Sequence, residues 1–480
     1  MKVLIISSNR NIYPEPVMPI GACMVAEAAK DAGHDIKLLD LMFKRGPHYD
    51  IRSAIKTFKP DVVSLSIRNI DNNDLSEPAR LYEGPKEMAG IIRQETGAPL
   101  VIGGAALSVM PRELLAQTGA DLAVLSDGER IFPAVLGALA GGKWPTDIEG
   151  TATMKDGMYV LTPLKQKKGS LSPSFRPPRY ERWLDKGRYL SMLSSAPMLT
   201  KAGCHFECVY CTYKKLDGGA YELMDPAEAA HEIERLSKTG FRDIEFVDNV
   251  FNSPLPHALS VCEEVIKKKI RARLHTVELN PLFITGELVK TMELAGFAGV
   301  GITAESASDP VLSGLKKGFG ASHVIKAAEI LRKSSLPCLW IFMLGGPGET
   351  QKTVRETLQF AQRYLKPNDA AFFNIGIRIY PGTWIEKIAR QEGLLSLSPQ
   401  EMLEPVFYLS PGLNFDWLFR ELESAIAGNL HLIDVRSMQS RHLPRIRRLC
   451  KMIGIKQPLW RHTAQIRRGL RLLGLEANGK

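Results

Sequence analysis

Short apolar runs rich in β-branched residues alternate with helical patterns through most of this 480-residue chain. Apolar strands separated by helices indicate parallel sheets that are covered on both faces. The pattern predicts an α/β fold that begins with a doubly wound, Rossmann-like domain over residues 1–142, which binds ligands at the C-terminal ends of its strands. Its strands are expected at Val3–Ile6, Ile36–Leu39, Val62–Ile67, Leu100–Ile102 and Leu122–Leu125, and its helices at Ala22–Asp31, Ile51–Phe58, Lys86–Glu95, Pro111–Gln117 and Ile131–Ala140.

The alternation stops at residue 143 and resumes near residue 195. Clustered Pro, Ser, Lys and Arg in this interval, including SLSPSFRPPRYERW, indicate a linker over residues 143–194. Six further strand–helix units predict a partial (β/α)6 barrel over residues 195–410, with its chemistry at the C-terminal strand ends. Residues 411–480 are expected to form a basic helical region. The barrel strands are expected at Met198–Thr200, Ile244–Val247, Leu274–Glu278, Val300–Ala304, Leu339–Leu344 and Phe373–Arg378.

Three of the seven cysteines, Cys204, Cys208 and Cys211, fall within eight residues directly after the first expected barrel strand. An odd number of cysteines, with the other four far apart, argues against disulfides and favours a metal site in a reducing, cytoplasmic compartment. Gaps of three and two residues let one loop place three thiolates on a [4Fe-4S] cubane, which leaves one iron open. Zinc is the alternative, but structural zinc sites are usually closed by a fourth Cys or His, and no second cysteine pair follows.

The cysteine loop, with Tyr210 just before its last cysteine, resembles the radical S-adenosylmethionine (radical SAM) superfamily. The resemblance extends over roughly residues 195–410 and implies that the open iron chelates S-adenosylmethionine. An electron from an external donor such as flavodoxin or ferredoxin then yields a 5′-deoxyadenosyl radical that abstracts hydrogen from the substrate. The cofactor contacts that the resemblance implies are Asp248 and Asn249 for the methionine moiety, Glu305 and Ser306 for the ribose and carboxylate, and Gly345 and Gly346 for the adenosine.

These polar strand ends also have ordinary structural interpretations. Carboxylates at strand ends often cap helices, and a Gly-Gly-Pro-Gly segment is often only a turn. The order and spacing of these segments after the cysteine loop favour the cofactor interpretation. The sequence assigns no residue to a catalytic acid or base.

The N-terminal domain resembles the domain of cobalamin-binding radical SAM enzymes in KVLIISS, DVVSLSIRN, VIGGAALSVMPRELL and GADLAVLSDGE. No Asp-x-His-x-x-Gly motif is present, so we expect cobalamin to bind without a protein histidine on cobalt. Arg68 follows the third strand, where it either faces the cobalt or is a solvated loop arginine. The remaining cobalamin contacts implied by the resemblance are Gly103 and Gly104 beside the nucleotide tail, and Ser64, Ser66 and the Ser126–Glu129 loop along the cleft.

Cobalamin together with a radical SAM barrel implies methylation of an unactivated carbon in a small molecule or lipid. Some relatives instead catalyse cyclisation or rearrangement without net methylation. Methylthiotransfer to tRNA would need a second cluster, but Cys23 is the only cysteine of the N-terminal domain. A non-catalytic iron–sulfur or RNA-binding protein is the remaining alternative, although an electron carrier normally closes its cluster with a fourth ligand, and no aromatic-rich RNA motif is present.

The basic character of the chain is concentrated at its C-terminal end. The net charge is +10, and residues 436–480 hold twelve Lys or Arg and one acid, Glu476, so the rest of the chain is close to neutral. The tail combines these bases with regularly spaced apolar residues, a pattern typical of helices that lie on anionic bilayers. It is equally typical of a solvated helical cap packed on the barrel. We therefore expect a peripheral contact with the inner membrane face or a structural cap, and nucleic acid is the least favoured partner.

Overall fold

The computed structural model describes all residues except 165–176, 215–217 and 475–480. Its N-terminal domain is a doubly wound α/β sheet with the strand order β2-β1-β3-β4-β5-β6-β7, in which β1 to β5 are parallel. Apolar clusters fill both faces of this sheet under the helices. The predicted fold class is confirmed for this domain. The elements are β1 (Lys2–Ser7), α1 (Ile20–Asp31), β2 (Asp35–Asp40), α2 (Pro47–Phe58), β3 (Val62–Ser66), α3 (Glu83–Glu95), β4 (Leu100–Gly103), α4 (Ala105–Val109), α5 (Pro111–Thr118), β5 (Leu122–Val124) and α6 (Gly128–Ala140).

The segment expected to be a linker is in part a β-hairpin. Strands β6 (Thr151–Lys155) and β7 (Met158–Thr162) turn at Asp156-Gly157 and add antiparallel to β5, so the first sheet extends beyond the boundary expected at residue 142. Two short helices, α7 (Tyr180–Trp183) and α8 (Lys186–Ser191), then lead to the barrel. Residues 170–176 of the predicted Pro- and Ser-rich linker lie outside the described residues.

The second domain is an open, all-parallel barrel with the strand order β18-β15-β14-β13-β12-β11-β8. Large apolar side chains on the strands pack against the surrounding helices in one continuous core. The six predicted strands are present, but the last splits into β15 (Ala370–Ile375) and β16 (Ile377–Arg378), and a seventh, β18, was not predicted. The other strands are β8 (Ala196–Met198), β11 (Asp243–Phe246), β12 (Arg273–Leu279), β13 (Phe297–Glu305), β14 (Cys338–Leu344) and β18 (Leu432–Asp434).

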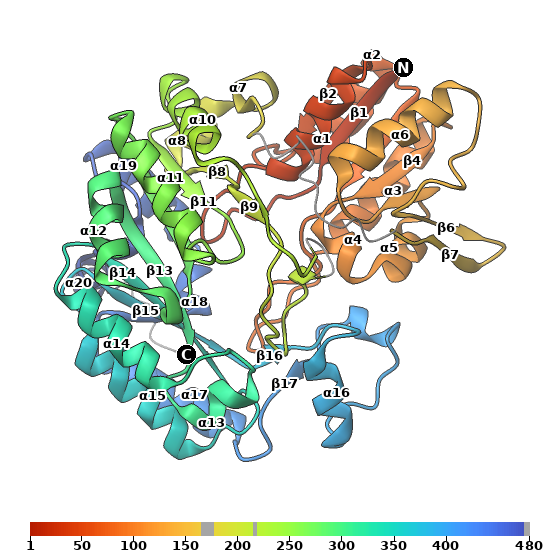
Figure 1. The fold of residues 1–480 in the computed structure, drawn as a ribbon. Helices are drawn as coiled ribbons and strands as arrows, with labels where there is room; N and C mark the ends of the chain where they lie inside the picture. Colours follow the sequence, from red (N-terminus) through yellow and green to blue (C-terminus); the bar gives the residue numbers. More distant parts are fainter. Residues whose placement is uncertain (165–176, 215–217, 475–480) are drawn as a thin grey trace.

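Helices of the barrel follow its strands and form its outer layer (Figure 1). Two small antiparallel pairs accompany the barrel, one formed by β9 and β10 and the other by β16 and β17. These further elements are β9 (Lys201–Ala202), β10 (Glu222–Leu223), α10 (Pro226–Lys238), α11 (Leu255–Lys267), η2 (Pro281–Phe283), α12 (Gly286–Ala295), α13 (Asp309–Gly314), α14 (Ala321–Arg332), α15 (Gln351–Tyr364), α16 (Trp384–Gln391), η3 (Glu401–Leu403) and β17 (Phe407–Tyr408).

The described part of the basic tail packs on the barrel. Arg467 is buried and donates hydrogen bonds to the carbonyl oxygens of Leu432 at 2.6 Å and Asn429 at 2.8 Å, which fixes the last helix beside β18. No described helix is long and apolar enough to cross a bilayer. The elements of this region are α17 (Phe415–Gly428), α18 (Val435–Met438), α19 (Leu443–Met452), η4 (Leu459–His462) and α20 (Thr463–Leu472).

Buried and exposed contacts join the two domains, which lie side by side in Figure 1. Arg378 donates from Nε to Asp71 Oδ2 at 2.7 Å, and the exposed fractions of these side chains are only 2% and 0%. Tyr380 donates to the same carboxylate at 3.2 Å. This buried and hydrogen-bonded ion pair fixes how the surfaces of the two domains align, because separating the partners would leave each charge buried and unpaired.

Candidate active site

The strand that leads into the cysteine loop is held by one buried carboxylate. Asp248, which follows β11, accepts hydrogen bonds from the backbone N–H and the hydroxyl of Thr200, at 2.7 and 2.6 Å, and from the N–H of Lys201 at 3.2 Å. Its side chain is fully buried. Lys201 Nζ in turn donates to the carbonyl oxygens of Val250, Phe251 and Ser253. Asp248 was predicted to contact the methionine moiety, and the contacts that the structure gives it are with the base of the cysteine loop.

Gly203 sets the direction in which the chain enters the loop. Its φ is +83°, and a Cβ at this position would overlap the carbonyl oxygen of Ala220. The N–H of Cys204 donates to the Gly218 carbonyl at 3.2 Å, and the N–H of Cys211 donates to the Cys208 carbonyl at 3.2 Å. Only glycine combines this backbone conformation with so close an approach.

The three predicted cluster ligands lie in this loop as free cysteines, with Cys204 buried and the other two partly accessible. Burial raises the pKa of Cys211 to about 11, and the nearby charges of Cys208 and Cys204 add to the shift. Burial also raises the pKa of Cys204, again with Cys208 contributing. The thiols are therefore near neighbours. Among the described residues, no three His, Cys, Asp or Glu side chains are arranged as a site for a single metal ion.

The donor set of the loop fits a [4Fe-4S] cluster. Three soft thiolates from one loop suit iron–sulfur ligation and leave one iron without a protein ligand. Lys317 is close enough to Cys211 to favour its thiolate, as Lys201 is to Cys204. These cations offset the negative charge that a thiolate-bound cluster brings into a partly buried loop.

Glu305 connects the cysteine loop to the end of β13. Its carboxylate accepts from Tyr210 Oη at 2.8 Å and from Lys317 Nζ at 3.2 Å, while Lys317 also reaches Tyr210 Oη at 3.1 Å. Glu305 has a φ of +62°, an uncommon conformation for a residue other than glycine, and such residues are concentrated at functional sites. The predicted site residue Glu305 and the loop residue Tyr210 are thus brought together.

Ser306, Gly345 and Gly346 make their contacts within the protein. Ser306 is fully buried and its hydroxyl lies 3.1 Å from the hydroxyl of Thr357. The N–H groups of Gly345 and Gly346 both donate to the carboxylate of Glu349, the second of them at 3.0 Å. The Gly-Gly-Pro-Gly-Glu segment is therefore a turn closed by its own glutamate. Asn249, beside Asp248, is half-buried.

On the N-terminal domain, the strand order switches at β1, whose neighbours are β2 and β3. Ser66 ends β3 there, and its carbonyl oxygen accepts from Ser8 Oγ at 2.7 Å. Gly104 has a φ of +102°, and a Cβ would overlap the carbonyl oxygen of Ile67. Ser64 is buried within β3, while Gly103, the last residue of β4, and Ser126, which follows β5, are partly accessible. This small-residue rim fits the approach of a large planar cofactor to the strand ends.

Arg68, in the loop after β3, interacts electrostatically with the barrel domain. Arg68 is exposed to solvent, but nearby protein atoms partly desolvate its guanidinium and lower its pKa, and the groups that oppose this shift are Tyr213 and Glu245, both in the barrel domain. Tyr213 follows the last cluster cysteine by two residues, and Glu245 lies on β11 between Ile244 and Phe246, which pack in the helix-covered core. Because side chains alternate along a strand, Glu245 points to the inner face of the barrel. Charged and polar groups of the two domains therefore interact across the domain boundary.

Two carboxyl groups in this region are kept from ionising. Burial, with help from Glu15, raises the pKa of Glu245 to about 8. Burial and the neighbouring Glu305 carboxylate raise the pKa of Glu278, on β12, to about 8 as well. Both groups can hold a proton at neutral pH and release it to a nearby base.

Sequence reasoning missed several residues that organise the site, namely Thr200, Lys201, Lys317, Glu245, Glu278 and Glu349. A polar residue inside an apolar strand, as in DIEF and HTVEL, is the one available signal, since it marks the inner face of the barrel. The lysines and Glu349 carry no such signal, because they act through segments distant in the sequence or through loop backbone.

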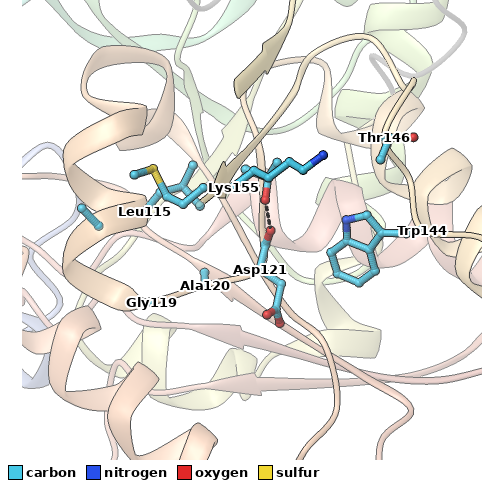
Figure 2. Close-up of a pocket in the computed structure, with 10 residues that line it drawn as sticks. Leu115, Gly119, Ala120, Asp121, Trp144, Thr146 and Lys155 are labelled. Atoms are coloured by element: carbon cyan, nitrogen blue, oxygen red, sulfur yellow. Dashed lines mark hydrogen bonds between the residues drawn. The ribbon is translucent and has the colours of Figure 1, made fainter. Parts of the chain in front are cut away.

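A cavity of about 700 Å³ lies elsewhere, beside the N-terminal end of β5 (Figure 2). Leu115, Ala120 and Trp144 are among its lining residues, and none of the predicted cofactor residues belongs to it. It lies at the end of the sheet opposite to the strand ends where ligands bind in this type of fold.

Comparisons with known proteins agree with both halves of this description. Residues 12–136 match the B12 binding domain and residues 198–361 match the radical SAM superfamily. The chain is 24% identical to an uncharacterized methyltransferase of Pyrococcus horikoshii, over 82% of this chain and 84% of the relative. It is 24% identical to the tryptophan 2-C-methyltransferase of Streptomyces laurentii, over 79% of this chain and 73% of the relative.

Among solved structures, the radical S-adenosylmethionine methyltransferase TsrM of Kitasatospora setae, with cobalamin and a [4Fe-4S] cluster bound, has the same fold. The TM-score is 0.84 at 22% identity, covering 98% of this chain and 99% of TsrM. The fold and the cysteine loop thus define a two-domain radical SAM architecture. Residues 12–136 thus match a B12-binding domain and residues 198–361 a radical SAM domain, as the sequence motifs predicted.

Proposed function

We propose that this protein is a cobalamin-dependent radical SAM methyltransferase that methylates an unactivated carbon of a small-molecule or lipid substrate. The observation that carries the proposal is that Arg68 of the B12-binding domain interacts electrostatically with Glu245 and Tyr213 of the barrel, and we place a shared cleft at this boundary. When bound, the cluster and S-adenosylmethionine supply a carbon-centred radical, and cobalamin supplies the methyl group. A cleft bordered by both cofactor domains lets one substrate carbon meet both reagents.

The residues of this chain bind and orient the reactants. Cys204, Cys208 and Cys211 hold the cluster, and Asp248 holds the backbone from which that loop starts. The linked side chains of Tyr210, Glu305 and Lys317 fix the loop against β13. Keeping these groups in place before the substrate binds avoids a reorganisation cost during the reaction.

On the cobalamin side, Gly103 and Gly104 leave room for the nucleotide tail, and Ser64, Ser66 and Ser126 border its path. Arg68 would lie beside the cobalt, and cobalamin would bind without a protein histidine because the domain has no Asp-x-His-x-x-Gly motif. Asn249, Ser306, Gly345 and Gly346 border S-adenosylmethionine mainly by shaping the strand ends that it contacts. We further propose that the enzyme acts in the cytoplasm and receives its electron from a flavodoxin or ferredoxin.

Methylthiotransfer to tRNA is disfavoured by the surroundings of Cys23. This thiol is fully buried in α1, and burial raises its pKa well above its usual value. A lone, protonated core cysteine cannot bind the second cluster that such a reaction needs.

The test is anaerobic purification followed by iron, sulfide and corrinoid analysis and incubation with S-adenosylmethionine carrying a deuterated methyl group. We expect four irons and one corrinoid per chain, formation of 5′-deoxyadenosine, and transfer of the labelled methyl to a product. Cys208→Ala should abolish 5′-deoxyadenosine formation, whereas Cys450→Ala, which alters a buried thiol outside the loop, should retain it.

Each contrary result has a defined meaning. Formation of 5′-deoxyadenosine by Cys208→Ala would show that the loop is not the radical source. A product that forms without the labelled methyl would replace methyl transfer by cyclisation or rearrangement. Eight irons without corrinoid would replace the proposal by methylthiotransfer.

A further inference from the structure

A second cavity, of about 220 Å³, lies at the end of the barrel opposite to the cysteine loop. Arg242 and Asp243 border it at the start of β11, and Arg273 borders it at the start of β12. Lys451 and Lys456, at and beyond the end of α19, complete its polar wall. Because the cluster loop follows the C-terminal end of β8, this cavity is separate from the proposed active site.

The cavity has a strong excess of positive charge. Arg273 donates from Nε to Asp243 Oδ1 at 2.7 Å and also pairs with Oδ2, so these two charges compensate each other. Among the described residues, Arg242, Lys451 and Lys456 have no ion-pair partner, and all three are exposed. Three uncompensated cations around one small cavity attract an anion with several oxygen atoms.

Ser194 adds a hydroxyl that lacks a partner. It lines the same cavity, its side chain is 2% exposed, and its Oγ has no hydrogen-bond partner in the part of the chain that the structure describes. A buried hydroxyl without a partner is destabilising, and most such groups in folded proteins are satisfied. An anionic oxygen in the cavity would accept this hydrogen bond.

The wall formed by the tail is anchored on both sides of Lys451 and Lys456. Arg447 donates to the Pro14 carbonyl at 2.9 Å and pairs with Glu15 at 3.1 Å. Gln457 donates to Glu15 at 2.8 Å and to the Leu193 carbonyl. The two lysines are therefore presented by a fixed segment, which reduces the ordering cost of binding.

Exposed apolar side chains stand next to this basic cavity. Leu449, Met452 and Ile453 are 54%, 79% and 64% exposed, and the last two directly precede the cavity residue Gly454. Large apolar side chains beside unpaired cations match the two layers of an anionic bilayer surface, with phosphate outside and acyl chains beneath.

We propose that this cavity binds the phosphate headgroup of an anionic phospholipid while Met452 and Ile453 enter the acyl layer beside it. The contact holds the protein on an anionic membrane surface with the opposite end of the barrel, which carries the cysteine loop, left accessible. The proposal rests on the cavity and the tail alone, so it is independent of the methyl-transfer reaction.

Vesicle flotation of the full-length holoenzyme tests this proposal. We expect flotation with vesicles of phosphatidylcholine and phosphatidylglycerol, loss of binding in high salt, and no flotation with phosphatidylcholine alone. Lys451→Gln/Lys456→Gln should weaken binding about thirtyfold, since each base near an anionic surface contributes roughly fivefold. Lys30→Gln/Lys86→Gln removes the same charge from exposed positions on the N-terminal domain and should leave binding unchanged.

Two further variants separate the headgroup contact from general electrostatic attraction. Ser194→Ala should weaken binding severalfold without any change in charge, and Met452→Asp/Ile453→Asp should abolish flotation.

Equal flotation of the Lys451→Gln/Lys456→Gln variant and its control would overturn the proposal. Saturable binding of inorganic phosphate without flotation would assign the cavity to a soluble anion, and retention on RNA that depends on these lysines would assign it to nucleic acid. Both results would also overturn the lipid assignment.

Discussion

Gly203 is the residue on which the geometry of the cysteine loop depends most directly. It combines a φ of +83° with an approach to the Ala220 carbonyl that leaves no space for a Cβ. We predict that Gly203→Ala displaces the loop and lowers the iron content of the reconstituted protein severalfold, together with its iron–sulfur absorbance. The loss of iron should exceed the loss that backbone strain at residue 203 alone would cause, because the backbone at Ala220 must also move.

Gly33→Ala is the matched control for this prediction. Gly33 has nearly the same φ, +87°, but open space around the position of a Cβ. The control should lose about 1 kcal/mol of stability and keep its full iron content. Equal iron content in both variants would show that the loop adapts and that the close approach to Ala220 has no role in cluster binding.

At the level of elements, the turn between β14 and α15 contains a pH-sensitive group. Burial raises the pKa of Glu349 to about 7, although the N–H groups of Gly345 and Gly346 oppose the shift. The folded state therefore keeps a proton that the unfolded state loses above about pH 4.5, so stability falls as the pH rises from there to about 7. The full effect is roughly 3 kcal/mol.

Glu349→Gln keeps an acceptor for the two glycine N–H groups and removes the titration. We predict that its thermal midpoint, relative to the wild type, rises between pH 5 and pH 8. The thermal midpoint of the exposed variant Glu287→Gln should differ from that of the wild type by the same amount at both pH values. A Glu349→Gln offset that does not change with pH would contradict the assigned protonation.

Among the elements, most of those encoded by a local sequence pattern were predicted, and those defined by distant contacts were not. The apolar strands were predicted because their patterns are local, and the cysteine loop was predicted because its spacing is local too. The hairpin of β6 and β7 was missed although Asp156-Gly157 is a strong local turn signal. By contrast, the contacts of Asp248 with Thr200 and Lys201 join segments about fifty residues apart, and no pattern within either segment encodes them. The three-residue strand β18 is similarly defined by its neighbour β15 and not by its own length.

At the level of the whole molecule, the proposed cleft requires the two domains to keep one relative position. The buried pair of Asp71 and Arg378 crosses this interface, and Arg378 also donates to the Met402 carbonyl at 2.7 Å. Removing one partner of a buried pair strands the other charge, which typically costs about 3–5 kcal/mol. The exposed pair of Arg80 and Glu404 crosses the same interface at 2.7 Å, and exposed pairs contribute about 0–1 kcal/mol.

We therefore predict that Asp71→Ala destabilises the protein by about 3–5 kcal/mol and separates its thermal unfolding into two transitions, one for each domain. Glu404→Ala should leave a single transition close to that of the wild type. Asp71→Ala/Arg378→Met should recover part of the loss, because it removes the stranded charge as well as its partner. If the double variant is as unstable as Asp71→Ala alone, the loss comes from the packing around Asp71, and the ion pair does not determine how the two cofactor domains are held together.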